Sequence, residues 1–250
     1  MLLAPRGLPG RAVLTSFRAM ALGRNPGKTH DKTFDHPDGW GIVYEEDGRL
    51  KSHRSARPCW DDPDFDGFGA ERVFLLHARR GTSGEVSADN AHPFSLYVDG
   101  ATWFFCHNGT VRDLLPDPGE RVGEASTDSC RLFRRLAAEG LGADPAGAIR
   151  SAYARLADFT SLNTLLLSDR EAWAVCCWTR DGDYYTLHLG EAASGPIVSS
   201  EPLDGIGRTW VSLANGDGVR VDRRTGALER RALLTASRRK GPLPTPGSTP

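Results

Sequence analysis

The sequence predicts an α+β protein in which short antiparallel strands enclose a helical middle. From Gly39 to about Val221 the chain alternates apolar or β-branched runs with turns of a few residues, which is typical of antiparallel sheets. Near the middle, two segments have apolar residues at helical spacing, and each follows a helix-capping residue. These observations together indicate the mixed class.

The first 30 residues allow two interpretations. They contain no Asp or Glu but several Arg residues, a composition that resembles an organellar transit peptide. The interpretation we prefer is a short helix of the mature fold. Thr15 or Ser16 would be its cap, and Phe17, Met20 and Ala21 would form its apolar face.

The next elements are predicted from apolar runs and turn residues. Gly41–Tyr44 and Leu50–His53 form a predicted hairpin, because turn-forming residues separate them. Cys59–Ala70 is rich in Asp and is predicted to be a loop. Val73–His77 and Thr102–Cys106 are apolar enough to be buried strands.

Two helices and five strands complete the predicted fold. Ser126 or Thr127 caps the first helix, and Asp144-Pro145 supplies the cap and first-turn proline of the second. The predicted strands are Asn163–Ser168, Glu171–Trp178, Tyr184–Leu189, Pro196–Ser200 and Thr209–Leu213. Residues 1–225 form one predicted domain. Residues 226–250, rich in Arg and then in Pro, Gly and Ser, are a predicted disordered tail.

Composition narrows the functional classes. The 250 residues are 39% hydrophobic and 25% charged, with a formal net charge of −1. Such a charge provides no bulk attraction to nucleic acid or to anionic membranes, so neither is an expected partner. No apolar run approaches the roughly 18 residues of a membrane-spanning helix. Five scattered cysteines argue against a disulfide framework and favour a reducing, cytoplasmic location.

A first polar cluster, His77–Gly84, directly follows a predicted buried strand. Arginine binds carboxylates through two parallel hydrogen bonds, and glycines at positions 81 and 84 let the backbone approach a ligand. Taken alone, an arginine at such a place is more often a surface or salt-bridging residue. Arg79 is therefore a candidate carboxylate ligand that needs support from its neighbours.

A second cluster, His107-Asn108-Gly109, follows the predicted strand at residues 102–106. The Asn108 side-chain amide and the Gly109 N–H offer two adjacent donors, the form of an oxyanion hole in acyl transfer. Asn-Gly is also the commonest pair in tight hairpin turns, and on spacing alone the turn is the simpler interpretation. From the residues alone both interpretations remain open.

A third cluster, Ser126–Ser129, lies at a predicted helix start. Asp128 there either complements the helix dipole or presents a carboxylate to the ammonium group of a ligand. His77, His92 and His107 lack the tight spacing of metal-binding motifs, so we expect neither a metal nor a cofactor.

Cys106 is a further candidate with two interpretations. On an alternating strand it shares a face with Asn108, which suggests a nucleophile beside the donor pair. A cysteine in an apolar strand is more often a packing residue.

In their order along the chain, these clusters resemble the class II glutamine amidotransferase domain. The motifs are Asp38-Gly39-Trp40-Gly41, His77-Ala78-Arg79 with Thr82-Ser83-Gly84, Asn90-Ala91-His92-Pro93-Phe94, His107-Asn108-Gly109 and Ser126-Thr127-Asp128-Ser129. Ser200-Glu201-Pro202-Leu203 and Trp210 are similar to the closing strands of stand-alone members. The resemblance implies the N-terminal-nucleophile hydrolase fold, a four-layer αββα sandwich of two antiparallel sheets between helical layers.

The resemblance also implies a chemistry, the hydrolysis of glutamine to glutamate and ammonia through a thioester. Arg79 would bind the substrate α-carboxylate and Asp128 its α-ammonium group. Asn108 and the Gly109 N–H would form the oxyanion hole. The residues that would shape the rest of the pocket are Thr82 and His92. Because no synthase domain follows, an ammonia acceptor would lie on a separate acceptor or synthase subunit.

The sequence departs from the family at the nucleophile, a cysteine at the mature N-terminus whose own α-amine is the base. The chain begins Met1-Leu2-Leu3 and has no cysteine before Cys59. Many relatives begin Met-Cys-Arg-Met-Leu, so we expect that translation starts further upstream and that Cys-Arg precedes Met1. Two alternatives remain: a hydrolase of another γ-glutamyl amide, and an inactive domain that only binds a ligand or partner.

Overall fold

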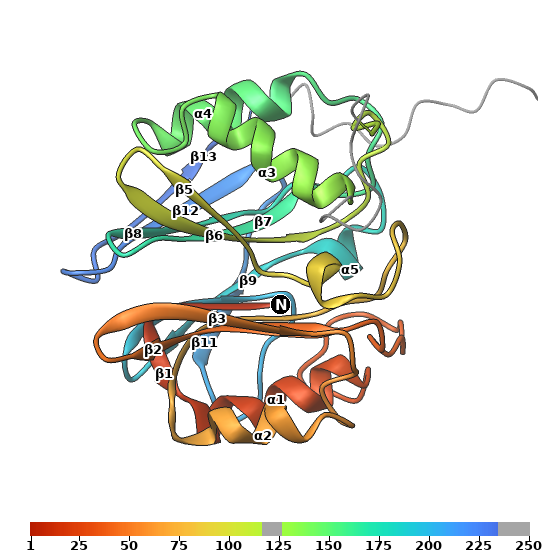
Figure 1. Ribbon diagram of the computed structural model, residues 1–250, viewed down its shortest axis with the longest axis vertical. Helices are drawn as coiled ribbons and strands as arrows, with labels where there is room; N and C mark the ends of the chain where they lie inside the picture. Colours follow the sequence, from red (N-terminus) through yellow and green to blue (C-terminus); the bar gives the residue numbers. More distant parts are fainter. Residues whose placement is uncertain (117–126, 235–250) are drawn as a thin grey trace, which may run out of the picture.

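Two antiparallel sheets lie face to face in the computed structural model, which describes residues 1–116 and 127–234 (Figure 1). The first sheet contains β1 (Leu2–Pro9), β2 (Trp40–Glu46), β3 (Arg49–Ser55), β4 (Arg72–Ala78), β9 (His188–Ala192), β10 (Gly195–Ser199) and β11 (Arg208–Ser212). The second contains β5 (Phe94–Val98), β6 (Ala101–Asn108), β7 (Asn163–Leu167), β8 (Glu171–Val175), β12 (Asp217–Asp222) and β13 (Leu228–Ala232). Within the described residues the strand orders are β11-β9-β10-β1-β4-β2-β3 and β13-β12-β8-β7-β6-β5.

Helices cover both outer faces of this pair of sheets (Figure 1). The helices are α1 (Gly10–Ala21), α2 (Pro63–Gly67), α3 (Asp128–Ala138), α4 (Pro145–Ala154) and α5 (Gly182–Tyr185), with 3-10 turns η1 (Phe68–Ala70) and η2 (Ala88–Asn90). Helices α1 and α2 lie on the first sheet, and α3 and α4 on the second. The fold is therefore the four-layer αββα sandwich that the resemblance implied.

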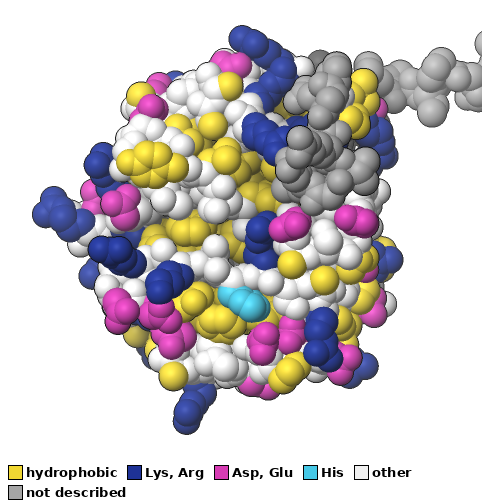
Figure 2. Space-filling view, viewed as in Figure 1, with side chains coloured by type: hydrophobic (Ala, Val, Ile, Leu, Met, Phe, Trp, Pro, Cys, Tyr) yellow, Lys and Arg dark blue, Asp and Glu magenta, His cyan; other side chains and the backbone are white. Residues whose placement is uncertain are grey.

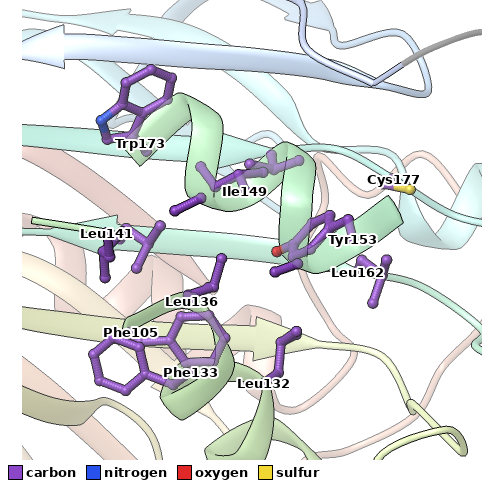
Figure 3. Close-up of a cluster of buried hydrophobic side chains, with 14 of the residues drawn as sticks. Phe105, Leu132, Phe133, Leu136, Leu141, Ile149, Tyr153, Leu162, Trp173 and Cys177 are labelled. Carbon is purple, nitrogen blue, oxygen red and sulfur yellow. The ribbon is translucent and has the colours of Figure 1, made fainter. Parts of the chain in front are cut away.

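Three apolar layers hold the sandwich together, and the alternation of side chains along each strand explains them. On β6, Phe104 and Cys106 face the other sheet, whereas Phe105 faces the helices. Figure 3 shows the Phe105 ring beside that of Phe133 from α3; their centroids are 4.8 Å apart and their planes 6° from parallel. Burial of such aromatic side chains is a large source of stability.

Strand β1 lies in the middle of the first sheet, between β10 and β4. Leu2 and Ala4 pack toward the helices, and Met1 and Leu3 pack toward the second sheet. The start of the chain consequently lies inside the molecule, between the sheets (Figure 1). The Arg-rich first residues thus form a central strand and a covering helix of the fold.

Several local predictions are confirmed. The hairpin is β2 and β3, joined through Asp47 and Gly48, both with positive φ. Thr127 caps α3, and Asp144 caps α4 by accepting a hydrogen bond from the N–H of Gly147 at 2.9 Å. The other proposed cap, Ser126, lies outside the described residues.

The first helix begins earlier than predicted. It starts at Gly10, directly after β1, and not at Thr15 or Ser16. The Gly10 N–H donates to the carbonyl of Glu71 at 2.8 Å, so a backbone group takes the place of a side-chain cap.

Two segments between strands were predicted wrongly. Cys59–Ala70 is not a loop but contains α2 and η1, because Asp62 caps α2 and Pro63 occupies its first turn. Tyr184–Leu189 is not one strand, since α5 ends at Tyr185 and β9 begins at His188. Strands β1, β5 and β12 were not predicted.

The predicted disordered tail does not begin at residue 226. Strand β13 pairs with β12, with Arg230 opposite Val219, and Arg220 forms an ion pair with Glu229 at 3.1 Å. All residues of β13 are exposed and most are polar, so the sequence of this strand resembles that of a disordered tail. The domain therefore extends past residue 225, and residues 235–250 lie outside the described residues.

The surface mixes charges of both signs. On the face drawn in Figure 2, Lys and Arg side chains alternate with Asp and Glu side chains, as expected for a net charge of −1. In the described parts of the chain, no helix is long and apolar enough to cross a membrane.

Candidate active site

Polar residues from distant parts of the chain line one cavity of about 220 Å³. The chain start, the ends of β4 and β6, the first turn of α3 and the residues after β10 all contribute to it. Its lining includes Arg79, Thr82, His92, Asn108, Gly109 and Asp128. The structure thus brings together the six residues that the sequence nominated for substrate binding and the oxyanion hole, whereas the other candidate, Cys106, does not line the cavity.

Arg79 is a buried cation that has no ion-pair partner among the described residues. It directly follows β4, where its N–H donates to the carbonyl of Gly39 at 2.8 Å. Its guanidinium donates to the carbonyl of Ser83 at 2.7 Å, and the residue is only 4% exposed. Among the described residues, no carboxylate oxygen lies within 4.0 Å of it. Since an uncompensated buried charge is costly, this guanidinium is suited to an anion from outside the chain.

The pKa of Arg79 is lowered from its ordinary value, because burial disfavours the charged form. The negative charges of Asp38 and Asp128 oppose this shift. Both carboxylates are therefore close enough to influence the guanidinium without forming an ion pair with it.

Asp128 adds a buried carboxylate to the same cavity. It is the first residue of α3, whose N-terminus favours negative charge. One carboxylate oxygen accepts a hydrogen bond from the N–H of Val111 at 2.6 Å, and the other accepts from the hydroxyl of Ser83 at 3.3 Å. The cavity therefore offers a cation and an anion, the complement of the zwitterionic head of an amino acid.

Two hydrogen-bond donors lie at the end of β6, one on its last residue, Asn108, and one on Gly109, which follows it. Gly109 has φ +150°, and a Cβ there would lie 2.0 Å from the carbonyl oxygen of Ser161, so a larger residue does not fit. None of the described residues accepts a hydrogen bond from the backbone N–H of Gly109 or from the side-chain amide of Asn108. The next described element is α3 and not a strand, so the hairpin-turn interpretation is wrong. The free donor pair is suited to an oxyanion.

Thr82 and His92 lie at different depths of the cavity. Thr82 is exposed, and its hydroxyl is 2.9 Å from that of Thr110. His92 is buried, with its ring 4.3 Å from that of His77 and 4.7 Å from that of Phe94. Burial lowers the pKa of His77 and of His92, so both rings are neutral near pH 7. Within the described residues, no group of three or more His, Cys, Asp or Glu is placed to hold a metal ion.

The resemblance placed the family's nucleophile at an N-terminus, but the contacts of the chain start in this cavity were not predicted. The Met1 amine donates to the hydroxyl of Ser200 at 2.9 Å, and burial lowers its pKa to about 6. Glu201 is buried nearby, where its carboxylate accepts a hydrogen bond from Asn25 at 2.8 Å and lies 3.2 Å from the ring nitrogen of His30. The motif containing Ser200 and Glu201 was visible in the sequence. Its place beside Met1 depends on the pairing of β1 with β10, which no local pattern shows.

Lys32, Phe34 and Tyr184 also line the cavity and had no signal in the sequence. Lys32 and Phe34 belong to the segment between α1 and β2, whereas Tyr184 belongs to α5. These residues meet only in three dimensions, so local spacing could not identify them.

The comparisons with known proteins agree on one family. The family described as glutamine amidotransferases class-II matches residues 13–193. The chain is 32% identical over 108 residues to an inferred glutamine amidotransferase of Haemophilus influenzae, an alignment that covers 41% of this chain and 36% of that protein. It is 29% identical over 115 residues to YafJ, an inferred glutamine amidotransferase of Escherichia coli, covering 42% of this chain and 44% of that protein. The chain therefore spans less than half the length of these curated relatives.

Solved structures share the fold. A class-II glutamine aminotransferase domain protein from Silicibacter pomeroyi has a TM-score of 0.59 and 23% identity, covering 77% of this chain and 90% of that one. The glutamine phosphoribosylpyrophosphate amidotransferase of B. subtilis has a TM-score of 0.68 and 13% identity, covering 93% of this chain and 48% of that one. At these identities the likeness establishes the fold alone.

Proposed function

Because the chain belongs to the class-II glutamine amidotransferases, we propose that it hydrolyses the γ-amide of glutamine or of a related γ-glutamyl compound through a thioester. The observation that supports this most directly is the buried guanidinium of Arg79, which forms no ion pair with any described residue and lies in a cavity that also contains the Asp128 carboxylate. In this proposal Arg79 binds the substrate α-carboxylate and Asp128 its α-ammonium group. Thr82 and His92 shape the surrounding pocket.

The strand register supports a nucleophile two residues ahead of Met1. Strands β1 and β4 are antiparallel, with Leu3 opposite Leu75 and Leu2 opposite Leu76. If the same register continued upstream, the residue two positions ahead of Met1 would lie opposite Arg79. Side chains alternate along a strand, and Met1 faces the space between the sheets. A cysteine two positions earlier would face the same space, beside the proposed α-carboxylate ligand.

The oxyanion donors face this space from the other sheet. Cys106 packs between the sheets, and Asn108, two residues later on β6, is on the same face. Cys106 itself is a poor nucleophile, because it is fully buried and burial raises the pKa of its thiol far above the ordinary range. The proposed nucleophile is therefore the upstream cysteine.

Each proton and bond can be followed through the proposed reaction. The α-amine of the upstream cysteine accepts the thiol proton, and the sulfur attacks the γ-carbonyl carbon. The Asn108 amide and the Gly109 N–H stabilise the negative oxygen. The C–N bond breaks, the leaving amine takes the proton from the ammonium group, and a thioester remains. Water deprotonated by the same amine then cleaves the thioester to release glutamate and the free thiol.

The leaving group and its fate belong to the same proposal. Free glutamine would release ammonia, which an acceptor on a separate synthase subunit could use. A larger γ-glutamyl amide would release its amine directly. The five free cysteines are all buried, which supports a reducing, cytoplasmic location.

The test compares three forms of the chain. One begins at Met1, one carries Met-Cys-Arg ahead of it, and a matched control carries Met-Ser-Arg; removal of the initiator methionine is checked by intact mass. We expect glutamate release from glutamine or a γ-glutamyl amide only with the cysteine form. All three forms should fold alike by circular dichroism.

Absence of turnover in a folded, correctly processed cysteine form would overturn the proposed reaction. If that form still bound glutamine, the chain would be a ligand-binding domain. Edman cycles on the protein from its own cells give an independent check, because cysteine is expected at the first cycle.

A further inference from the structure

The mouth of the cavity has a continuous rim of side-chain contacts. On one side the Arg80 guanidinium lies 4.2 Å from the centroid of the Phe34 ring, and Phe34 meets Tyr184 edge to face at 6.1 Å. Tyr184 contacts Tyr185 at 4.9 Å between centroids. On the other side the hydroxyl of Thr82 reaches that of Thr110 at 2.9 Å. Three aromatic rings and one cation therefore form most of this rim.

The aromatic side of this rim connects to the segment that carries the proposed oxyanion donors. The Tyr185 hydroxyl donates to Thr160 Oγ1 at 3.3 Å, and Thr160 Oγ1 accepts from the N–H of Thr110 at 2.9 Å. Thr110 directly follows Gly109. The aromatic side of the rim thus begins next to the place where the scissile amide would lie.

Arg80 and the three aromatic residues of the rim have no task in binding the glutamyl half of a substrate. The proposed function uses Arg79 and Asp128 for the head group and Asn108 and Gly109 for the carbonyl oxygen. What lies beyond the scissile bond must therefore occupy the part of the cavity lined by Phe34, Tyr184 and their neighbours. A leaving group as small as ammonia would leave this part without a contact.

The charges of the rim favour an anion at one place. Lys32 lies over the Tyr184 ring at 4.9 Å, but its ammonium is already paired with Asp181 at 3.1 Å. Arg80 is exposed, and among the described residues its guanidinium donates to the backbone carbonyl of Asp35, at 3.4 Å. No carboxylate of the described residues lies within 4.0 Å of that guanidinium. Of the two rim cations Lys32 and Arg80, Arg80 is thus the one that remains available to a ligand among the described residues.

The apolar part of the rim is available as well. Phe34 is 40% exposed although it lies against a cation and another ring. Aromatic rings gain free energy from offset or edge-to-face contact with a further ring, and from removal of apolar surface from water. The open surface of Phe34 beside Tyr184 is therefore suited to a flat apolar group.

We propose that the rim binds the leaving half of a γ-glutamyl amino acid whose side chain is aromatic. Arg80 binds the α-carboxylate of that leaving amino acid, and Phe34 with Tyr184 contacts its ring. The inference rests on the proposed function, because it assumes that the glutamyl half lies at Arg79. Hydrolysis consumes one water, breaks the γ-amide C–N bond and yields glutamate and the free aromatic amino acid.

The first experiment measures binding to the chain that begins at Met1, in which turnover does not interfere. The ligands are glutamine, γ-glutamylalanine, γ-glutamylphenylalanine and γ-glutamylphenethylamine, and the method is titration calorimetry. We expect γ-glutamylphenylalanine to bind about tenfold more tightly than both γ-glutamylalanine and γ-glutamylphenethylamine, a factor equal to about 1.4 kcal/mol. The first comparison removes the ring and the second removes the carboxylate.

Substitutions then assign each part of the ligand. Phe34→Ala is expected to make γ-glutamylphenylalanine bind no more tightly than γ-glutamylalanine. Arg80→Met is expected to make it bind no more tightly than γ-glutamylphenethylamine. Matched controls are Tyr97→Ala, which removes an aromatic residue that is 77% exposed on β5, and Arg150→Met on α4. These controls should preserve both differences in affinity.

The outcomes separate this inference from the function on which it rests. Equal affinities for all four ligands would overturn the rim as a leaving-group site and leave the glutamyl site supported. No binding of any ligand would overturn both. With the cysteine form, cleavage of glutamine at a kcat/KM equal to or above that of γ-glutamylphenylalanine would also overturn the rim proposal.

Discussion

Replacing Arg79 by methionine is expected to weaken glutamine binding about 30- to 900-fold. The guanidinium is buried and donates to the carbonyl of Ser83, and it has further N–H groups for a substrate carboxylate. Loss of its charged hydrogen bonds to a carboxylate corresponds to about 2–4 kcal/mol, which gives this range of Kd. Methionine preserves most of the side-chain length, so the change is mainly one of charge and donors.

The assay isolates the carboxylate by a cycle of two ligands and two proteins. Titration calorimetry on the chain beginning at Met1 compares glutamine with 4-aminobutanamide, which lacks only the α-carboxylate. The unsubstituted chain should strongly prefer glutamine, whereas Arg79→Met should bind both ligands with similar weak affinity. The difference between the two preferences measures the coupling of Arg79 to the carboxylate.

One result would refute this reasoning. If Arg79→Met lost the same factor for both ligands, the guanidinium would only hold the loop through Ser83 and would not contact the carboxylate. Arg79→Lys supplies a second check, since lysine keeps the charge without the planar fork. An intermediate loss for glutamine is expected, and thermal unfolding shows whether each variant is folded.

Three further predictions concern catalysis, local stability and pH. In the cysteine form, Gly109→Ala should lower kcat by about 100-fold or more in single-turnover assays, because the added Cβ collides with the Ser161 carbonyl and displaces an oxyanion donor; unchanged kcat would remove Gly109 from that role. Asp62→Ala should lower the free energy of unfolding by about 2 kcal/mol in urea titrations, since Asp62 caps α2 and accepts from the buried Trp40 indole at 3.0 Å, whereas Asp61→Ala should have little effect. Burial lowers the pKa of five histidines: His36, His77, His92, His107 and His188. The unfolded chain therefore binds more protons than the folded chain below about pH 6.5. The free energy of unfolding should fall as the pH decreases from 6.5 toward 4, because the pKa of His36 and of His188 is lowered to about 4. A free energy of unfolding that stays constant over this range would contradict the burial of these rings.

The parts of the fold that could be predicted are those with local causes. Asp144-Pro145 and Thr127 mark helix starts because caps act on neighbouring N–H groups. Asp62-Pro63 contains the same cap and first-turn signal, yet the many Asp residues around it suggested a loop. Strand β13 could not be predicted, since its exposed residues are mostly polar and its place in the sheet comes from pairing with β12.

The candidate site divides in the same way. Arg79, Asn108, Gly109 and Asp128 follow strands or begin a helix, where polar residues stand out from apolar runs. The rim residue Phe34 lies in an irregular segment, and its importance appears only when α5 brings Tyr184 next to it. Polar groups at the ends of regular elements could therefore be nominated from the residues alone. Thr82 and His92, in irregular segments, were nominated only through the family resemblance, and Phe34 and Tyr184 were not nominated at all.

The position of β1 explains why a chain start is suited to this chemistry. A backbone amine occurs only at an N-terminus, and β1 places its start in the middle of a sheet, between β4 and β10. At Met1 burial lowers the pKa of the amine from 8.0 to about 6, so most of it is unprotonated at pH 7. An amine two residues upstream would lie further along the same ladder, at the cavity. If the cavity excludes water there as it does at Met1, that amine is a neutral base at pH 7, able to accept a thiol proton without a histidine partner.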